Sequence, residues 1–216
     1  MSQQEFATHP RTSRNDAEPL APANVPVPTP EIADPGPLGL AGFAMTTFVL
    51  SVFNAGLLPA TLTADVLGLA LFYGGIVQLL AGMWEFRKGN TFGALAFSSF
   101  GAFWLSFWYY IAYVAPKLPA ADVHNATGLY LLGWTIFTAY MTVASLRTTT
   151  AVAAVFVTLT ATFLLLTISE FAQASSIGKV GGYVGLLTAL LAWYASFAGV
   201  TNATYKRVVL PVRPLT

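Results

Sequence analysis

Six long stretches without a charged residue constrain this chain more than any other feature of its sequence. Each reaches the length of about 18 residues that a helix needs to cross the hydrocarbon core of a bilayer. The uncharged stretches are residues 35–64, 66–84, 89–116, 123–146, 148–169 and 180–205. Backbone groups in lipid must hydrogen-bond within their own segment, and no ten-residue alternation typical of a barrel is present, so we expect six transmembrane helices.

The composition agrees with a lipid environment. Of the 216 residues, 56% are hydrophobic and 9% are charged, whereas about a quarter of the residues are charged in an ordinary soluble domain. The 10 basic and 9 acidic residues are too few to cover the surface of a soluble protein of this size. The net charge of +1 provides no basic patch, so we expect no nucleic-acid partner.

Catalytic and metal chemistry find little support in the sequence. The chain has no cysteine and only two histidines, His9 and His124, neither of which lies in a ligand motif. Disulfides and a cysteine nucleophile are therefore excluded, and we expect no metal site. We also find no nucleophile–base pair and no cofactor motif, so we expect neither an enzyme nor a bound cofactor.

Prolines indicate where the helices end. Eight of the 13 prolines precede residue 38, and the other five lie at the edges of the uncharged stretches or beyond them, where a helix can stop. We therefore expect an all-α membrane domain over residues 37–205. Its helices are expected at about 38–58, 65–84, 92–114, 127–146, 149–168 and 181–202. Residues 1–36, rich in Pro and Ala, predict a disordered N-terminal tail, and residues 206–216 form a short C-terminal tail.

Basic residues predict the orientation of the helices. One side of the predicted topology holds six of them, namely Arg87, Lys88, Arg147, Lys206, Arg207 and Arg213, and the other side holds only Lys117 and Lys179. Because short cytoplasmic loops carry the excess of Lys and Arg, we expect both termini in the cytoplasm.

Polar residues inside the predicted helices are the candidates for lining a path. No predicted helix carries Lys, Arg, Asp or Glu at its middle, although such residues mark the pathways of ion pumps. A path for neutral molecules, or for small ions held by neutral dipoles, fits better. Asn54 and Gln78 have the most polar surface to desolvate, and Thr46 offers a further donor. Glu85, beside Arg87 and Lys88, is either an interfacial ion-pair residue or a gate or proton relay. Asp65 and Glu170 are weaker candidates at helix edges.

Several motifs carry a resemblance to a known family. The first predicted helix begins D-P-G-P-L-G-L-A-G-F-A-M-T-T at residues 34–47, and F-Y-G-G-I-V-Q-L-L-A-G-M-W-E follows at 72–85. Further matching segments are K-G-N-T-F-G at 88–93, S-F-G-A-F-W at 99–104 and V-L-P at 209–211. Together, over about residues 38–211, they resemble the acetate uptake transporter family, which includes the bacterial succinate–acetate permeases. The chain departs from that pattern at Asp34, where Asn is usual, and at Gly36, where Ala is usual.

The resemblance implies a fold, an activity and a set of site residues. It implies a six-helix protomer, assembled as a homohexamer in the plasma or inner membrane, with a substrate path through each protomer. The substrates would be acetate and other short carboxylates such as succinate or formate, commonly coupled to protons. It further implies a hydrophobic constriction of Phe43, Tyr73 and Leu159 and a size-selectivity position at Ala192.

The chemistry of such a path is consistent with the residues. A carboxylic acid with a pKa of about 4 keeps a small neutral fraction at mildly acidic pH. A dry aromatic neck favours that neutral form, or a dehydrated anion helped by donors such as Thr46, Asn54 and Gln78. Two other interpretations remain open: a channel for another small solute such as urea, an amide or ammonia, and a membrane sensor or scaffold that transports nothing.

Overall fold

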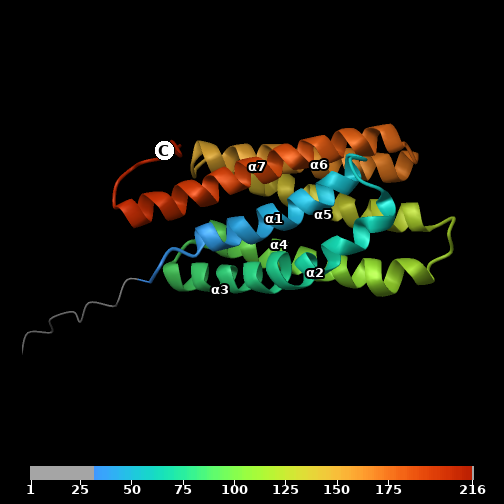
Figure 1. Cartoon of the computed structure of the whole chain (residues 1–216), viewed down its shortest axis with the longest axis horizontal. Helices are drawn as coiled ribbons and strands as arrows, with labels where there is room; N and C mark the ends of the chain where they lie inside the picture. The colour runs from blue at the N-terminus through green and yellow to red at the C-terminus, as the bar shows by residue number, and fades with distance from the viewer. Residues whose placement is uncertain (1–31, 216) are drawn as a thin grey trace, which may run out of the picture. The chain divides into compact units, whose positions relative to one another are not determined.

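The computed structural model describes residues 32–215, which form helices, turns and one isolated β-bridge. In chain order the helices are α1 (Gly36–Asn54), η1 (Ala60–Asp65), α2 (Val66–Leu71), η2 (Phe72–Val77), α3 (Gln78–Lys88), α4 (Thr91–Tyr109), η3 (Tyr110–Val114), η4 (Ala115–Lys117), α5 (Val123–Ser145), α6 (Thr150–Ala172) and α7 (Ser175–Tyr205). Since η1 to α3 run on without a break and η3 continues α4, they make six helical segments that run back and forth along one axis (Figure 1). The predicted N-terminal tail lies, up to residue 31, outside the described residues.

Four of the six segments are, by length and apolar composition, able to cross a membrane. Within the described part of the chain these are Gly36–Asn54, Thr61–Lys88, Thr150–Ala172 and Ser175–Tyr205. The α4 and α5 helices are of similar length but contain more Trp, Tyr, Ser and Thr, which lowers their mean hydropathy.

Several predicted helix boundaries differ from the structure by four residues or more, namely the ends of the first, second and fifth helices and the starts of the fourth and sixth. The first helix ends at Asn54 rather than near residue 58, because the chain turns at Gly56, whose φ of 73° is easily adopted only by glycine. The last helix begins at Ser175 rather than near residue 181. Lys179 had set the predicted start there, but this lysine lies in the second turn of α7, at the end of the bundle, where a charge can stay outside the apolar region.

The tight turn between α3 and α4 shows how sequence determines a connection. Gly89 ends α3 with a φ of 79°, and the side chain of Asn90 caps α4 by accepting a hydrogen bond from the N–H of Gly93 at 3.2 Å. Thr149 caps α6 in the same way, accepting from the N–H of Val152 at 3.2 Å.

Small residues allow the helices to approach closely. A Cβ on Gly42 of α1 would lie 2.6 Å from the carbonyl oxygen of Tyr73, and a Cβ on Gly101 of α4 would lie 2.7 Å from the backbone nitrogen of Leu79. A Cβ on Gly182 of α7 would overlap the backbone of Ala55. Small residues at such contacts are typical of helices packed in lipid, where backbone proximity replaces the hydrophobic effect as the source of attraction.

The second segment contains a six-residue π-helical stretch, η2, at the Phe72-Tyr73-Gly74-Gly75 sequence. Gly74 and Gly75 are buried there, and a Cβ on Gly74 would lie within 3 Å of both Thr46 and Trp104. A π-helical stretch inserts an extra residue into a helix and often occurs at functional sites.

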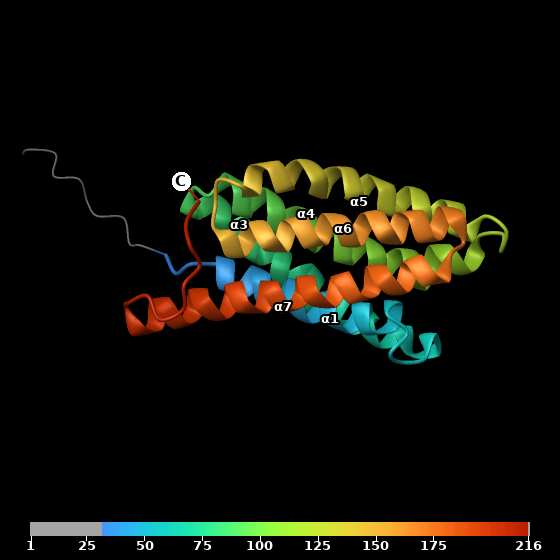
Figure 2. The same cartoon turned by 90° about the horizontal axis from the view of Figure 1, so that it is seen from above.

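The bundle has two ends that differ in the segments they bring together (Figure 1 and Figure 2). The end on the left of Figures 1 and 2, which we call the near end, holds the start of α1, the α3–α4 and α5–α6 turns, and the C-terminal segment. There the carbonyl of Arg213 accepts the N–H of Thr150 at 2.8 Å. At the far end lie residues 115–122 and the α6–α7 turn.

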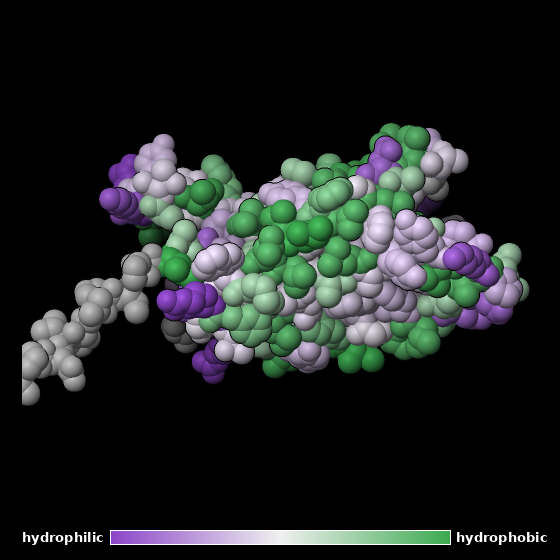
Figure 3. Space-filling view, turned by 90° about the horizontal axis from the view of Figure 1, so that it is seen from below, coloured by the Kyte–Doolittle hydropathy of each residue, from purple (hydrophilic) through white to green (hydrophobic). Residues whose placement is uncertain are grey.

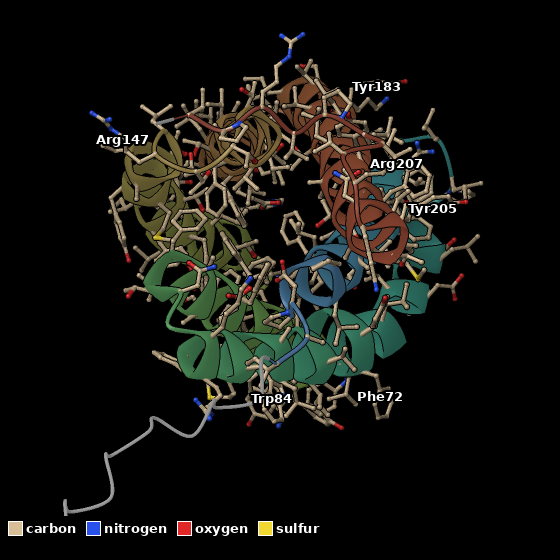
Figure 4. The ribbon with its side chains drawn as sticks, turned by 90° about the vertical axis from the view of Figure 1, so that its left-hand side faces the viewer. Phe72, Trp84, Arg147, Tyr183, Tyr205 and Arg207 are labelled. Atoms are coloured by element: carbon tan, nitrogen blue, oxygen red, sulfur yellow. The ribbon has the colours of Figure 1, made fainter. Side chains whose placement is uncertain are left out.

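The surface changes character between these ends. Figure 3 shows the most hydrophilic residues toward the two ends and mainly apolar or weakly polar residues between them. In a view along the bundle, Phe72 and Trp84 point away from the other helices (Figure 4), with 62% and 56% of their surface exposed. Large apolar side chains on the outside are expected where the neighbouring medium is lipid or another copy of the chain.

Candidate functional site

Four cavities follow one another from the near end of the bundle to the far end. We call them the near cavity, the neck, the far cavity and the far vestibule, with volumes of about 280, 20, 200 and 370 Å³. The near cavity shares Leu40, Ala96, Phe97 and Phe156 with the neck, the neck shares Phe43 and Leu159 with the far cavity, and the far cavity shares Asn54, Leu166 and Glu170 with the far vestibule. Because successive cavities share wall residues, they lie next to one another along the bundle, and we call this series of cavities the path, with the neck as its smallest member.

The neck is narrow because aromatic rings from three helices meet there. Phe43 of α1 and Phe156 of α6 both lie against Phe100 of α4, with ring centroids 5.6 and 6.0 Å from it. Leu159 closes the side toward the far cavity, and both Phe43 and Leu159 are buried. A volume of about 20 Å³ holds about one water molecule. In this conformation the neck is therefore a hydrophobic constriction.

One polar side chain reaches the neck. Gln78, the first residue of α3 after the π-helical stretch, lines the neck and is 1% exposed. Its Oε1 atom accepts no hydrogen bond from any residue that the structure describes. A buried polar atom without a partner costs free energy, so this amide is suited to a molecule that pairs with it in passing.

Two residues that line the far cavity carry further buried polar atoms of this kind. Thr47 Oγ1 and Trp104 Nε1 both lie in residues that line it, and neither atom has a hydrogen-bond partner within the described part of the chain. The indole N–H can only donate, and the hydroxyl can donate or accept. The rest of the wall is mainly apolar, with rings such as Phe103 and Phe163. An apolar cavity with a few donors is the usual form of a site for a small polar ligand.

In the near cavity, by contrast, the polar groups satisfy one another. Asp34 Oδ1 accepts the N–H of Gly36 at 2.9 Å and pairs with Lys88 Nζ at 2.7 Å. Glu85 Oε2 accepts a hydrogen bond from Asn90 Nδ2 at 2.8 Å. Glu85 is buried, and its hydrogen bond goes to Asn90, whereas Lys88 pairs with Asp34. The carboxylate of Asp34 thus accepts a hydrogen bond from the first backbone N–H of α1, that of Gly36.

The structure brings some of the predicted site residues together and separates others. Phe43, Leu159 and Gln78 meet at the neck, and Asn54 lies between the far cavity and the far vestibule. Glu85 lies in the near cavity.

Three predicted residues do not line any of the four cavities. The hydroxyl of Thr46 donates to its own helix, to Gly42 O at 2.9 Å. Tyr73 is half-buried, with its backbone carbonyl and ring edge beside Gly42, one residue from Phe43. Ala192 is completely buried in the core cluster that also holds Phe43 and Leu159.

Several residues on the path were not predicted as site residues. Thr47 could have been found from helical phase, because Phe43, Thr47, Leu50 and Asn54 are three or four residues apart and therefore share one face of α1. Thr46 lies about 70° from the middle of that face, whereas Thr47 lies about 30° from it. The pairing of His124 Nδ1 with Glu170 Oε2, at 2.7 Å across 46 residues of sequence, had no local signal.

Comparisons with known proteins agree with one another. The family described as GPR1/FUN34/yaaH matches residues 17–216. The chain is 45% identical over 201 residues to the ammonia transport outward protein 2 of Saccharomyces cerevisiae, covering 90% of this chain and 70% of that protein. It is 40% identical over 184 residues to the succinate-acetate/proton symporter SatP of Escherichia coli, covering 84% of this chain and 96% of that protein. The structure of the bacterial acetate channel SatP superposes with a TM-score of 0.79 at 38% identity, covering 84% of this chain and 99% of that chain.

Proposed function

Since the chain belongs to the GPR1/FUN34/yaaH family, we propose that it carries acetate and other short-chain carboxylates, such as succinate, across a membrane. The observation that supports this most is the series of four cavities, closed at one hydrophobic neck, with unpartnered polar atoms in residues that line the neck and the far cavity.

The neck and the donors have separate tasks in this proposal. Phe43 and Leu159 close the path to water, so that a carboxylic acid passes in its neutral form or as a dehydrated anion. Thr47 and Trp104 replace part of its hydration in the far cavity, and Gln78 pairs with it in the neck. Tyr73 acts on the neck indirectly, through its contact with Gly42 next to Phe43. Ala192 acts on it through the core cluster that also holds Phe43 and Leu159. A substrate that brings its own proton makes transport proton-linked without a buried acid in the neck.

We further propose that all six segments cross the membrane, with the near end in the cytoplasm. The near end holds Arg87, Lys88, Arg147, Lys206, Arg207 and Arg213, as the positive-inside rule requires. The chain then lies in the plasma or inner membrane of the cell, and Glu85 lies at the cytoplasmic gate. Tags at both termini should resist protease added to intact cells and be cut once the cells are opened. Digestion in intact cells would overturn this orientation.

The outward-facing apolar residues of several helices support an assembly of copies, and by family analogy we propose a homohexamer. Mass measurement of the detergent-purified complex tests this number directly, and a monomeric mass would contradict it.

The experiment that tests the transport proposal is uptake of radiolabelled acetate into proteoliposomes that contain the purified chain. We expect uptake above protein-free vesicles, faster with the outside acidic and reduced by excess unlabelled succinate. Uptake equal to protein-free vesicles at every pH would contradict the proposal.

Ammonia is the second candidate, because a relative is named for ammonia transport and the neck contains no charged residue. The same vesicles, loaded with a pH-sensitive dye and given a pulse of ammonium chloride, distinguish the two. Faster alkalinisation than in protein-free vesicles, without acetate uptake, would favour ammonia.

A further inference from the structure

The charged residues of the far vestibule come from three different helices. Among the described residues that line it, the charged or titratable ones are His124 of α5, Glu170 of α6 and Lys179 of α7. His124 Nδ1 and Glu170 Oε2 are 2.7 Å apart, and both side chains are partly exposed. Asn54, at the end of α1, is the neutral polar residue that faces them from the remaining helix.

Glu170 has a special position along the path. It lines both the far vestibule and the far cavity, and no other charged residue lines the far cavity in the described part of the chain. Its pairing partner, His124, lines only the vestibule. The carboxylate of Glu170 thus lies at the boundary between the far cavity and the far vestibule, and its partner His124 lies on the vestibule side.

Lys179 provides a second positive charge beside this pair. Its Cε atom would lie 3.2 Å from a Cβ on Gly56, so its chain lies over the turn after α1 and reaches the vestibule. Lys179 forms no ion pair with any residue that the structure describes. With His124 protonated, the three side chains carry a net charge of one positive unit, and with His124 neutral they carry none.

We infer that His124 and Lys179 form a capture site for the substrate carboxylate at the far mouth, and that Glu170 occupies this site as a competitor built into the chain. This inference rests on the proposed function. The side chain of Glu170 ends in the same chemical group as acetate, so any site that holds one can hold the other. An arriving carboxylate takes over His124, supported by Lys179, and displaces Glu170 at the boundary to the far cavity.

The charge on His124 decides how strongly the site competes for anions. When His124 is protonated, the site attracts anions. When it is neutral, only Lys179 remains to balance Glu170, and capture weakens.

Variants separate capture from transport itself. In proteoliposomes at about pH 6, His124→Gln should raise the KM for acetate about threefold, with little change in the maximal rate. Lys179→Met should act in the same direction. Glu170→Gln, which removes the competitor, should lower the KM, and the double variant with His124→Gln should lose that gain. Lys117→Met, at the same end of the bundle but outside the four cavities, is the matched control.

A binding measurement keeps this test independent of transport. The chain has only two histidines, so a His9→Gln background leaves His124 as the single histidine signal in an NMR spectrum of the full-length protein in detergent. Acetate should shift this signal in a saturable way, at lower concentration in the Glu170→Gln variant, and chloride at equal concentration should not. No acetate-dependent shift, together with a KM that His124→Gln and Glu170→Gln leave unchanged in correctly eluting protein, would overturn the inference. A saturable shift in a protein that transports no acetate would instead overturn the proposed function and leave the capture site standing.

Discussion

The near and far cavities both pair their carboxylates within the chain, Asp34 with Lys88 and Glu170 with His124, but they differ in whether buried polar atoms are left without a partner. In the near cavity, Asp34 pairs with Lys88 and Glu85 accepts a hydrogen bond from Asn90, so each carboxylate has a partner within the chain. In the far cavity, Thr47 Oγ1 and Trp104 Nε1 are buried without a partner among the described residues. Satisfied groups hold a structure in place, whereas unpartnered buried donors gain most from a ligand. Under the proposed function, the near half of the path positions helix ends and the far half is the better place to hold the substrate.

The largest effect is expected at the neck, which separates the two halves. Phe43→Ala removes a buried ring and should cost on the order of 3 kcal/mol of packing stability, while widening and wetting the constriction. We predict faster leakage of acetate and admission of bulkier carboxylates, measured as flux per correctly eluting complex. Tyr73→Ala should act in the same direction but more weakly, because its ring lies beside Gly42 rather than in the neck. Phe72→Ala, on the outer surface, is the control.

If Phe43→Ala protein elutes normally and keeps the wild-type rate, pH dependence and size limit for carboxylates, the constriction lies elsewhere in the molecule. The division into two halves would then have no physical boundary at Phe43 and Leu159.

The next largest effect concerns the two donors of the far cavity. Thr47→Val keeps the shape of the side chain and removes the donor, whereas Trp104→Phe removes the donor together with part of the buried ring. A hydrogen bond to a charged group contributes about 1.5–3 kcal/mol, so each variant should raise the KM for acetate at least about tenfold. Thr138→Val is the matched control, because this buried hydroxyl donates to its own helix at Trp134 O and lines none of the four cavities. An unchanged KM in both donor variants would mean that Thr47 and Trp104 do not bind acetate, which would contradict the proposed difference between the near and far cavities.

A smaller effect on selectivity is expected at Ala192. This residue is fully buried in the cluster that contains Phe43 and Leu159, so added methyl groups should press those side chains toward the neck. Ala192→Val should reduce uptake of succinate more than uptake of acetate, and Ala192→Phe should do so more strongly if it folds. Ala203→Val, on the exposed near end of α7, is the control. A succinate-to-acetate ratio equal to that of the wild type would exclude Ala192 from selectivity.

The smallest effect is expected at Asp34, where the family pattern has Asn. The ion pair with Lys88 is exposed and contributes only about 0–1 kcal/mol, and an asparagine can still accept the N–H of Gly36. Asp34→Asn should therefore change the KM for acetate by less than about twofold, measured by uptake at several concentrations. A change of tenfold would mean that Asp34 handles the substrate and that the near half also binds it.

The sequence predicts the fold better than the path. Charge spacing is enough for six helical segments, because a charge rarely lies in the middle of an apolar helix, and the resemblance to the acetate transporter family is confirmed. The end of α1 was missed, because the turn at Gly56 depends on a backbone conformation that hydrophobicity does not encode.

Residues on one helix were predictable by phase, but pairs between helices were not. Counting in helical turns from Phe43 to Asn54 would have favoured Thr47 over Thr46. The π-helical stretch at Phe72–Val77 shifts the phase of the second segment, so the direction of Tyr73 cannot be read from a regular period. The His124–Glu170 pair depends on the packing of α5 against α6, which brings together residues that are distant in sequence.

The most direct test of the central claim, that substrate passes inside each protomer, uses the absence of cysteine from the chain. Asn54→Cys introduces a single thiol between the far cavity and the far vestibule. We predict that a charged methanethiosulfonate reagent abolishes most of its acetate uptake, and that acetate slows the labelling. Leu129→Cys, on the outer face of α5 and 67% exposed, should keep its uptake under the same treatment. Complete labelling of Asn54→Cys, verified by mass spectrometry, with uptake undiminished would contradict a path through these cavities.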